Sequence, residues 1–245
     1  MTFFGNLETS SDIQQEQDFV SRGGLLDSDI YTLTIKLAYG VIAGSGAKGL
    51  AIVGETEDGR EVRQTFYLTS GTAKGCLNFW TDQNGKKHYL PGFNMADSLA
   101  LLTVGKSITE LPTETKKISL WNSEVRAEVP TDVPMFMDLI GQKIKAGIQK
   151  QLVNKTAQGS SGKWVNTSET REVNEIDKFF RERDSKTTTE IRAEAPEANY
   201  IEIWKTQNQG QLIDKVKKAD PSTSRAANSS ASNGGTAMPT KSLFA

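Results

Sequence analysis

The chain has 245 residues, with 29 Lys and Arg against 30 Asp and Glu and a formal net charge of −1, so it provides one large or two small domains with enough apolar residues for a core. A single cysteine, Cys76, excludes an internal disulfide, and together with a single histidine, His88, it excludes a zinc site of thiolates and imidazoles. Any Ser or Cys nucleophile would have only His88 as its base, which argues against that type of catalysis.

The first half of the chain predicts an arm followed by β-structure. Residues 1–29 are polar with scattered apolar side chains and are expected to form an arm or a short helix on the domain. Period-two alternation and hairpin turns then predict the strands. The expected elements are a strand from Ile30 to the turn at 44–46, strands over 50–56 and 61–69, and a hairpin of 76–81 with 86–90.

The second half mixes helices with longer strands. Apolar residues at helical spacing predict a helix over 93–104, with Asn94 as its N-cap and Gly105 as its stop. The remaining expected elements are strands over 116–122, from 141 onward and over 172–180, a loop at 159–162, and a helical region over 190–207 interrupted near Pro196.

The stretch from Gly141 to Val165 is unusual because it contains five lysines and no acidic residue. Ile144, Ala146 and Ile148 alternate with Lys143, Lys145 and their polar neighbours, the pattern of a half-buried strand with one positive face. Segregated charge in a nearly neutral chain indicates a surface that binds a polyanion. A solvated sheet face that happens to use lysine is the alternative.

About seven to nine short strands with an interposed helix predict a mainly β fold, an elaborated oligonucleotide-binding (OB-like) barrel with one or two helices, over residues 30–207. Such barrels hold single strands through basic side chains on phosphates and aromatic rings on bases. Candidate contacts are the basic and aromatic side chains on predicted non-core faces, turns and hairpins: Lys36, Arg63, Tyr67, Lys74, Trp80, Lys86, Lys87, Tyr89, Lys143, Lys145, Lys163 and Trp164.

Several aromatic residues have a simpler interpretation as core. Tyr31 and Tyr39 share a predicted face with Leu33, so we assign both to the core. For Trp80, Trp121 and Trp204, packing is favoured over stacking, although Trp80 stays among the candidates because lysines surround it.

Signatures of catalysis are weak. The chain has no P-loop motif. Glu55, Glu57 and Asp58 lie close together and are compatible with a magnesium site of a nuclease, but carboxylates at a predicted turn are commonly there for solvation. We predict a protein that is not an enzyme, without metal or cofactor.

Residues 208–245 are predicted to be a disordered tail, because from Ala219 onward they are mostly Ser, Ala, Asn, Gly and Thr. The tip carries Lys241, Leu243 and Phe244, and large apolar side chains at the end of a solvated tail suggest a protein partner. A fortuitous ending without a function is the alternative. The N-terminus lacks the features of a signal peptide, and no segment approaches the roughly 18 apolar residues of a membrane span, so we expect a soluble intracellular protein that binds no membrane.

Five segments carry a resemblance to a known family: residues 1–7 (MTFFGNL), 31–36 (YTLTIK), 90–93 (LPGF), 138–142 (DLIGQ) and 169–171 (ETR). Together they resemble the single-stranded-DNA-binding proteins of lytic podoviruses that carry a giant virion RNA polymerase, over the chain as far as about Gln207. The resemblance implies a protein that coats single strands during phage replication and recombination in the cytoplasm of the infected bacterium.

In that family the C-terminal end also contacts the host RNA polymerase and activates late transcription, and the matching positions here are Lys241, Leu243 and Phe244. Replication proteins are the other partners that the tail is expected to contact. Asp220 is the only acidic residue from Ala219 onward, so recognition there cannot depend on a run of carboxylates. The alternative function is a phage structural or assembly protein, which the near-neutral charge favours slightly.

Overall fold

The computed structural model describes residues 24–122, 125–159 and 162–219. The fold is mainly β, as predicted. The strands are β1 (Asp29–Ile42), β2 (Lys48–Thr56), β3 (Glu61–Tyr67), β4 (Phe79–Thr81), β5 (Lys87–Tyr89), β6 (Glu114–Asn122), β7 (Ala127–Met135), β8 (Lys143–Gln158), β9 (Trp164–Phe180) and β10 (Leu212–Asp214). The helices are α1 (Pro91–Thr103), α2 (Thr188–Arg192) and α3 (Tyr200–Asn208).

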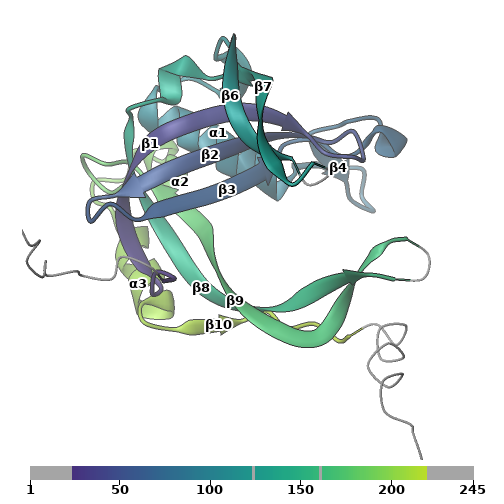
Figure 1. Cartoon of the computed structure of the whole chain (residues 1–245). Coiled ribbons are helices and arrows are strands. Elements are labelled where there is room, and N and C mark those ends of the chain that lie inside the picture. Colours follow the sequence, from purple (N-terminus) through teal and green to yellow (C-terminus); the bar gives the residue numbers. More distant parts are fainter. Residues whose placement is uncertain (1–23, 123–124, 160–161, 220–245) are drawn as a thin grey trace, which may run out of the picture.

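Strand β1 is the centre of an open, mainly antiparallel sheet of eight strands (Figure 1). Its first half pairs with β8 and its second half with β2, which in turn pairs with β3. A β-bulge lies between Ile35 and Leu37 and shifts the alternation, so that Ala38 is buried in the core. Tyr39 therefore lies on the outer face of the sheet, and its assignment to the core was wrong.

Helix α1 lies against the inner side of the sheet and completes the main core (Figure 1). It packs against β3, β8 and β9 and buries Phe93, Ala96 and Leu99 in the same core as the apolar residues of β1 and β2. The helix begins at Pro91 with Leu90 as its N-cap, so the prediction of Asn94 as the cap was wrong. Proline suits the first helical position because its missing N–H would have no partner there, and this signal outweighs the asparagine.

The sheet stays open between β3 and β9, where a side chain replaces the backbone pairing. The Gln64 carboxamide accepts a hydrogen bond from the Ile176 N–H at 2.6 Å and donates one to the Ile176 carbonyl at 3.4 Å. One glutamine thus copies both hydrogen bonds of a neighbouring strand.

Replacing Gln64 by alanine is expected to lower the free energy of unfolding by about 1–3 kcal/mol, because the buried Ile176 amide loses its partner. Urea denaturation measures the loss, and hydrogen exchange at Ile176 should accelerate. Thr65→Ala is the control, since the exposed Thr65 is the next residue of the same strand and its loss should stay within about 0.5 kcal/mol. Equal stability of the two variants would mean that the Gln64 bridge does not hold β3 against β9.

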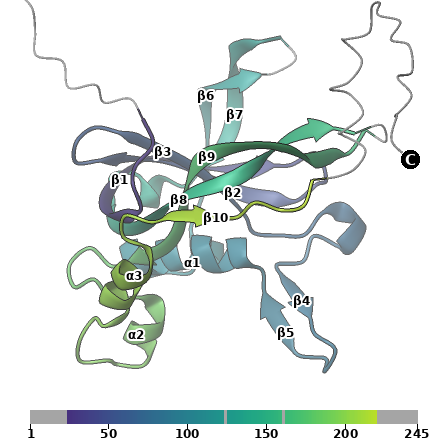
Figure 2. The ribbon, with the colours of Figure 1, turned by 90° about the horizontal axis from the view of Figure 1, so that it is seen from below.

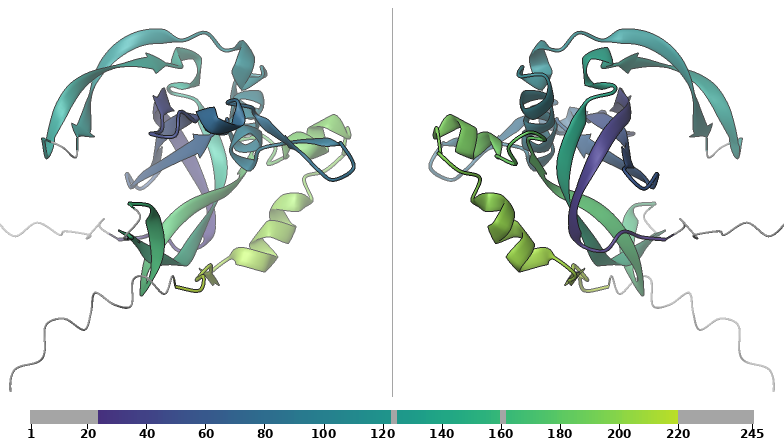
Figure 3. Two further views of the ribbon diagram at one scale, coloured as in Figure 1. Left: turned by 90° about the vertical axis from the view of Figure 1, so that its right-hand side faces the viewer. Right: turned by 90° about the vertical axis from the view of Figure 1, so that its left-hand side faces the viewer.

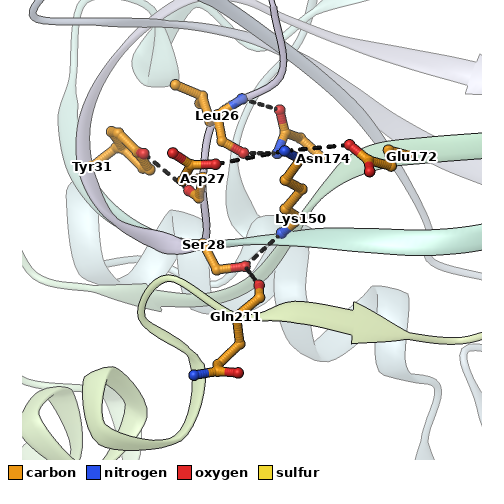
Figure 4. A network of polar contacts seen from close by, with 8 residues as sticks. All are labelled: Leu26, Asp27, Ser28, Tyr31, Lys150, Glu172, Asn174 and Gln211. Atoms are coloured by element: carbon orange, nitrogen blue, oxygen red, sulfur yellow. Dashed lines mark hydrogen bonds and ion pairs between the residues drawn. The ribbon is translucent and has the colours of Figure 1, made fainter.

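The folded body extends beyond both predicted boundaries, at 29 and at 207. Figure 4 shows that Ser28 donates to the Gln211 carbonyl and accepts from the Lys150 N–H, while Leu26 exchanges two hydrogen bonds with the Asn174 side chain. Strand β10 runs parallel to β8, and the Lys217 N–H donates to Asn154. Residues 24–29 of the predicted arm and 208–219 of the predicted tail thus belong to the folded body. The rest of the arm and tail, residues 1–23 and 220–245, lies outside the described residues.

Helix α3 covers the second face of β8, which was predicted to present lysines to water. Trp204 is only 1% exposed and sits so close to Gly147 that a Cβ there would lie 2.7 Å from the indole. Further along the strand, Gln149 is buried and donates to Asn208 of α3. Only the beginning of β8, at Lys143 and Lys145, keeps the expected lysine pattern, and the prediction of an open positive face along the whole strand was wrong.

Candidate nucleic-acid interface

Three hairpins extend from the body: β4–β5, β6–β7 and the outer part of β8–β9 (Figures 2 and 3). Each carries a tryptophan that is more than half exposed: Trp80 at 51%, Trp121 at 67% and Trp164 at 71%. The packing favoured for Trp80 and Trp121 was therefore wrong, whereas that of Trp204 is confirmed. Large rings in water indicate a binding surface, because a tryptophan gains much free energy when it is covered.

In the β4–β5 hairpin the exposed rings are held in place by other rings. Trp80 stacks on His88 with the ring centroids 4.8 Å apart, and Tyr89 stacks on Phe93 of α1 at 4.7 Å. His88 is itself fixed by Asp82, whose carboxylate lies 3.0 Å from its Nε2. The contact with His88, and then the backbone N–H of Lys86 and Asn84, lower the pKa of Asp82. The hairpin therefore presents two oriented aromatic surfaces.

The lysines predicted around this hairpin lie on it or near its base. Lys87 is on β5 with its ammonium 4.5 Å from the centre of the Phe79 ring, and Lys86 is exposed in the turn. Lys74 is exposed in the helical turn Thr72–Lys74, which bonds to the β1–β2 turn. Tyr67, 49% exposed, ends β3 where its backbone touches Gly92 of α1, so it lies between the outer face of the sheet and the base of the hairpin.

The outer face of β1–β3 carries tyrosines together with basic side chains that form ion pairs with neighbouring carboxylates. Tyr39 lies opposite Ala51, which lies opposite Thr65, and Arg63 and Tyr67 share that face of β3. A hydrogen bond with Glu61 raises the pKa of Arg63. Tyr39 is a candidate that the sequence analysis missed, because no sequence signal marks the bulge that turns it outward.

Charge on this face is less positive than the sequence suggested. Lys36 pairs with Glu55 at 2.9 Å, and Arg63 pairs with Glu61. Lys143 lies opposite Thr34, which lies opposite Glu55, so Lys143 and Lys36 belong to one stretch of the outer surface. Lys145 is half-buried and donates to Ser185 at 2.9 Å.

Lys143 also borders a pocket of about 580 Å³ between the end of α1 and the end of β9. Arg181 and Arg183 line the same pocket. Arg181 forms an ion pair with Asp184, and this contact lowers the pKa of Asp184 to about 2. No ion pair of Lys143 or Arg183 occurs among the described residues.

The predicted contacts thus fall into three separate groups and do not share one face of the sheet. The outer face of the sheet carries Lys36, Arg63 and Lys143, and Tyr67 lies at its end. The tip of the β8–β9 hairpin carries the exposed Lys163 and Trp164. The β4–β5 hairpin projects to the opposite side from β6–β7 (Figures 2 and 3). The partner residues predicted at the C-terminus, Lys241, Leu243 and Phe244, lie outside the described residues.

The part of the chain that the structure describes contains no group of three or more His, Cys, Asp and Glu side chains arranged to hold a metal. Glu55 is engaged by Lys36, and Asp58 by Arg60 and Thr56. None of the described helices has the length and apolar character needed to cross a membrane. No protein-family model matches the chain, and a search of curated proteins finds no relative of it.

Proposed function

We propose that this chain is a non-enzymatic protein that binds single-stranded DNA and coats it with little preference for sequence. The observation that carries the proposal is the exposure of three of the four tryptophans on three separate hairpins. Unpaired bases offer a π-face whatever their identity, and each base stacked on an aromatic ring contributes about 1–3 kcal/mol. Paired bases are stacked inside a duplex and are not available to these rings.

We also propose that the sheet is an elaborated OB-type barrel. Three features support it: β1 pairs with both β2 and β8, α1 is inserted between β3 and β8, and Gln64 links β3 to β9. The β4–β5 and β6–β7 hairpins are then insertions on either side of α1. OB-type barrels hold a strand through a groove with stacking rings and cations, which agrees with the exposed rings described above.

The biological setting rests on the sequence resemblance. On that basis we propose that the protein coats DNA during phage replication and recombination in the cytoplasm of the infected host. Contact with the host RNA polymerase or with replication proteins would come from the C-terminal end at Lys241, Leu243 and Phe244.

The first test is titration of the full chain with oligo-dT at low salt, followed by tryptophan fluorescence and by a mobility-shift assay. We expect quenching, because bases stack on Trp80, Trp121 and Trp164, and we expect binding to weaken as salt rises. Duplex DNA of the same length should bind more weakly. Unchanged fluorescence together with an absent mobility shift would refute the proposed function.

Within this function, Tyr67→Ala should weaken the binding of oligo-dT by about 1–3 kcal/mol through the loss of stacking. The exposed ring contributes little to the core, so thermal unfolding should change little. Tyr67→Phe keeps the ring and is expected to bind like the unaltered chain. Wild-type affinity of Tyr67→Ala would remove Tyr67 from the interface.

A further inference from the structure

A hollow of about 280 Å³ opens directly beside the β4–β5 hairpin. Its walls come from β5, α1, β9 and α2, and the side chains that matter are Tyr89, Asn94, Ser98, Lys178, Thr188 and Arg192. Small-molecule sites start near 300 Å³, so this hollow is about large enough for a single nucleotide.

One wall of the hollow is an aromatic surface fixed in orientation. Tyr89 is 56% exposed although Phe93 stacks on one side of it, with an interplanar angle of 28°. Phe93 is buried in the core, so the tyrosine rests on a rigid support. A base that stacks on Tyr89 would order little additional structure and would lose correspondingly little conformational entropy.

Two cations line the hollow without a carboxylate partner among the described residues. Lys178 has its ammonium 5.2 Å from the centre of the Tyr200 ring, and Arg192 is exposed at the end of α2. The one carboxylate in the lining, Asp97, accepts hydrogen bonds from the Ser107 hydroxyl and the Ile108 N–H. In contrast to Lys36 and Arg63 on the outer face, these two cations are available to a phosphate.

We propose that this hollow binds one nucleotide of the bound single strand, a site that deepens the function proposed above and rests on it. Tyr89 stacks the base, Lys178 and Arg192 hold the phosphate, and the side chains of Asn94 and Ser98 hydrogen-bond the sugar or the base edge. The site lies next to β4–β5, the hairpin that projects away from β6–β7 (Figures 2 and 3). The strand therefore contacts the protein well beyond the outer face of β1–β3.

The test compares Lys178→Gln/Arg192→Gln with the unaltered full chain, using the anisotropy of fluorescein-labelled oligo-dT across a salt series. Each lost phosphate contact reduces the slope of log K against log salt by about 0.7, and because the two cations hold one phosphate the double variant should lose about 0.7. Affinity near 0.1 M salt should then fall about 5-fold. Arg192→Gln alone should lose about half of that slope, and it leaves the contact between Lys178 and Tyr200 in place.

Lys215→Gln is the matched control, because this exposed lysine follows β10 and does not line the hollow, so its slope should be unchanged. Tyr89→Leu separates stacking from charge: affinity should fall about 5- to 150-fold at every salt concentration with the slope unchanged, while Tyr89→Phe should bind normally. A wild-type slope in the double variant, with oligo-dT still bound, would overturn the nucleotide site and leave the general function intact. Failure of the unaltered chain to bind oligo-dT would overturn both.

Discussion

Trp204→Ala is expected to lower the free energy of unfolding by about 3–5 kcal/mol, among the largest losses that one core substitution produces. The indole is almost completely buried and packs with Phe180 and Ile201 in a second, smaller core. Its Nε1–H donates to the Asp177 carboxylate at 2.7 Å. Alanine would leave a cavity above Gly147 and remove the hydrogen bond of Asp177.

Urea denaturation followed by circular dichroism measures this effect. Ile203→Ala is the matched control, because Ile203 precedes Trp204 on α3 and is 49% exposed, so its loss should be well below that of Trp204. Gly147→Ala gives a reciprocal test, since the added Cβ would meet the indole at 2.7 Å and must displace it. If Trp204→Ala costs less than about 1 kcal/mol, α3 does not contribute to the folded body as described.

Strands and turns with strong local signals could be predicted from the sequence. The alternation in β3 predicted that strand, and Asp58-Gly59 and Asn84-Gly85 predicted the β2–β3 and β4–β5 hairpins, where Gly59 and Gly85 indeed have positive φ. The helix over 93–104 is confirmed as α1, although its start was misplaced. These elements are determined by neighbours in the chain, which a single sequence displays.

The missed features depend on contacts between distant residues. Strand β7 was overlooked because it contains Pro130 and Pro134, which lack the N–H of a central strand, yet proline is tolerated in a ribbon that pairs mainly with β6. The bulge in β1 has no local marker. The covering of β8 by α3 could not be predicted, because only the fold brings Trp204 above Gly147.

The candidate site was predictable in type but not in arrangement. The sequence did contain a signal that Trp121 is exposed. In β6 the apolar residues Ile118 and Leu120 are half-buried on one face, and Trp121 lies with Ser119 on the opposite, exposed face. That alternation places the ring on the polar face, although composition favoured the core. The sequence could not show which cations form ion pairs with acidic side chains. Lys36, for example, reaches Glu55 only because β1 pairs with β2.

Trp121→Ala and Trp164→Ala together are expected to produce the largest loss of DNA binding. In Figure 3 both β6–β7 and the outer part of β8–β9 lie on the side of the body away from β4–β5. Each ring should contribute about 1–3 kcal/mol of stacking, so a strand that contacts both loses about 2–6 kcal/mol, or at least about 30-fold in affinity. Folding should be unaffected, because both rings are largely in water.

A double-mutant cycle with a long oligo-dT shows whether the two hairpins hold one strand. Additive losses indicate that a single strand passes over both rings, whereas a shorter oligonucleotide that reaches only one hairpin should respond to one substitution and not to the other. Trp121→Tyr and Trp164→Tyr retain a stacking ring and serve as controls. If the double alanine variant bound oligo-dT as tightly as the unaltered chain, the strand would have to be held elsewhere. The stacking would then have to come from Trp80 and Tyr89 on the opposite hairpin, whose rings are supported by His88 and Phe93.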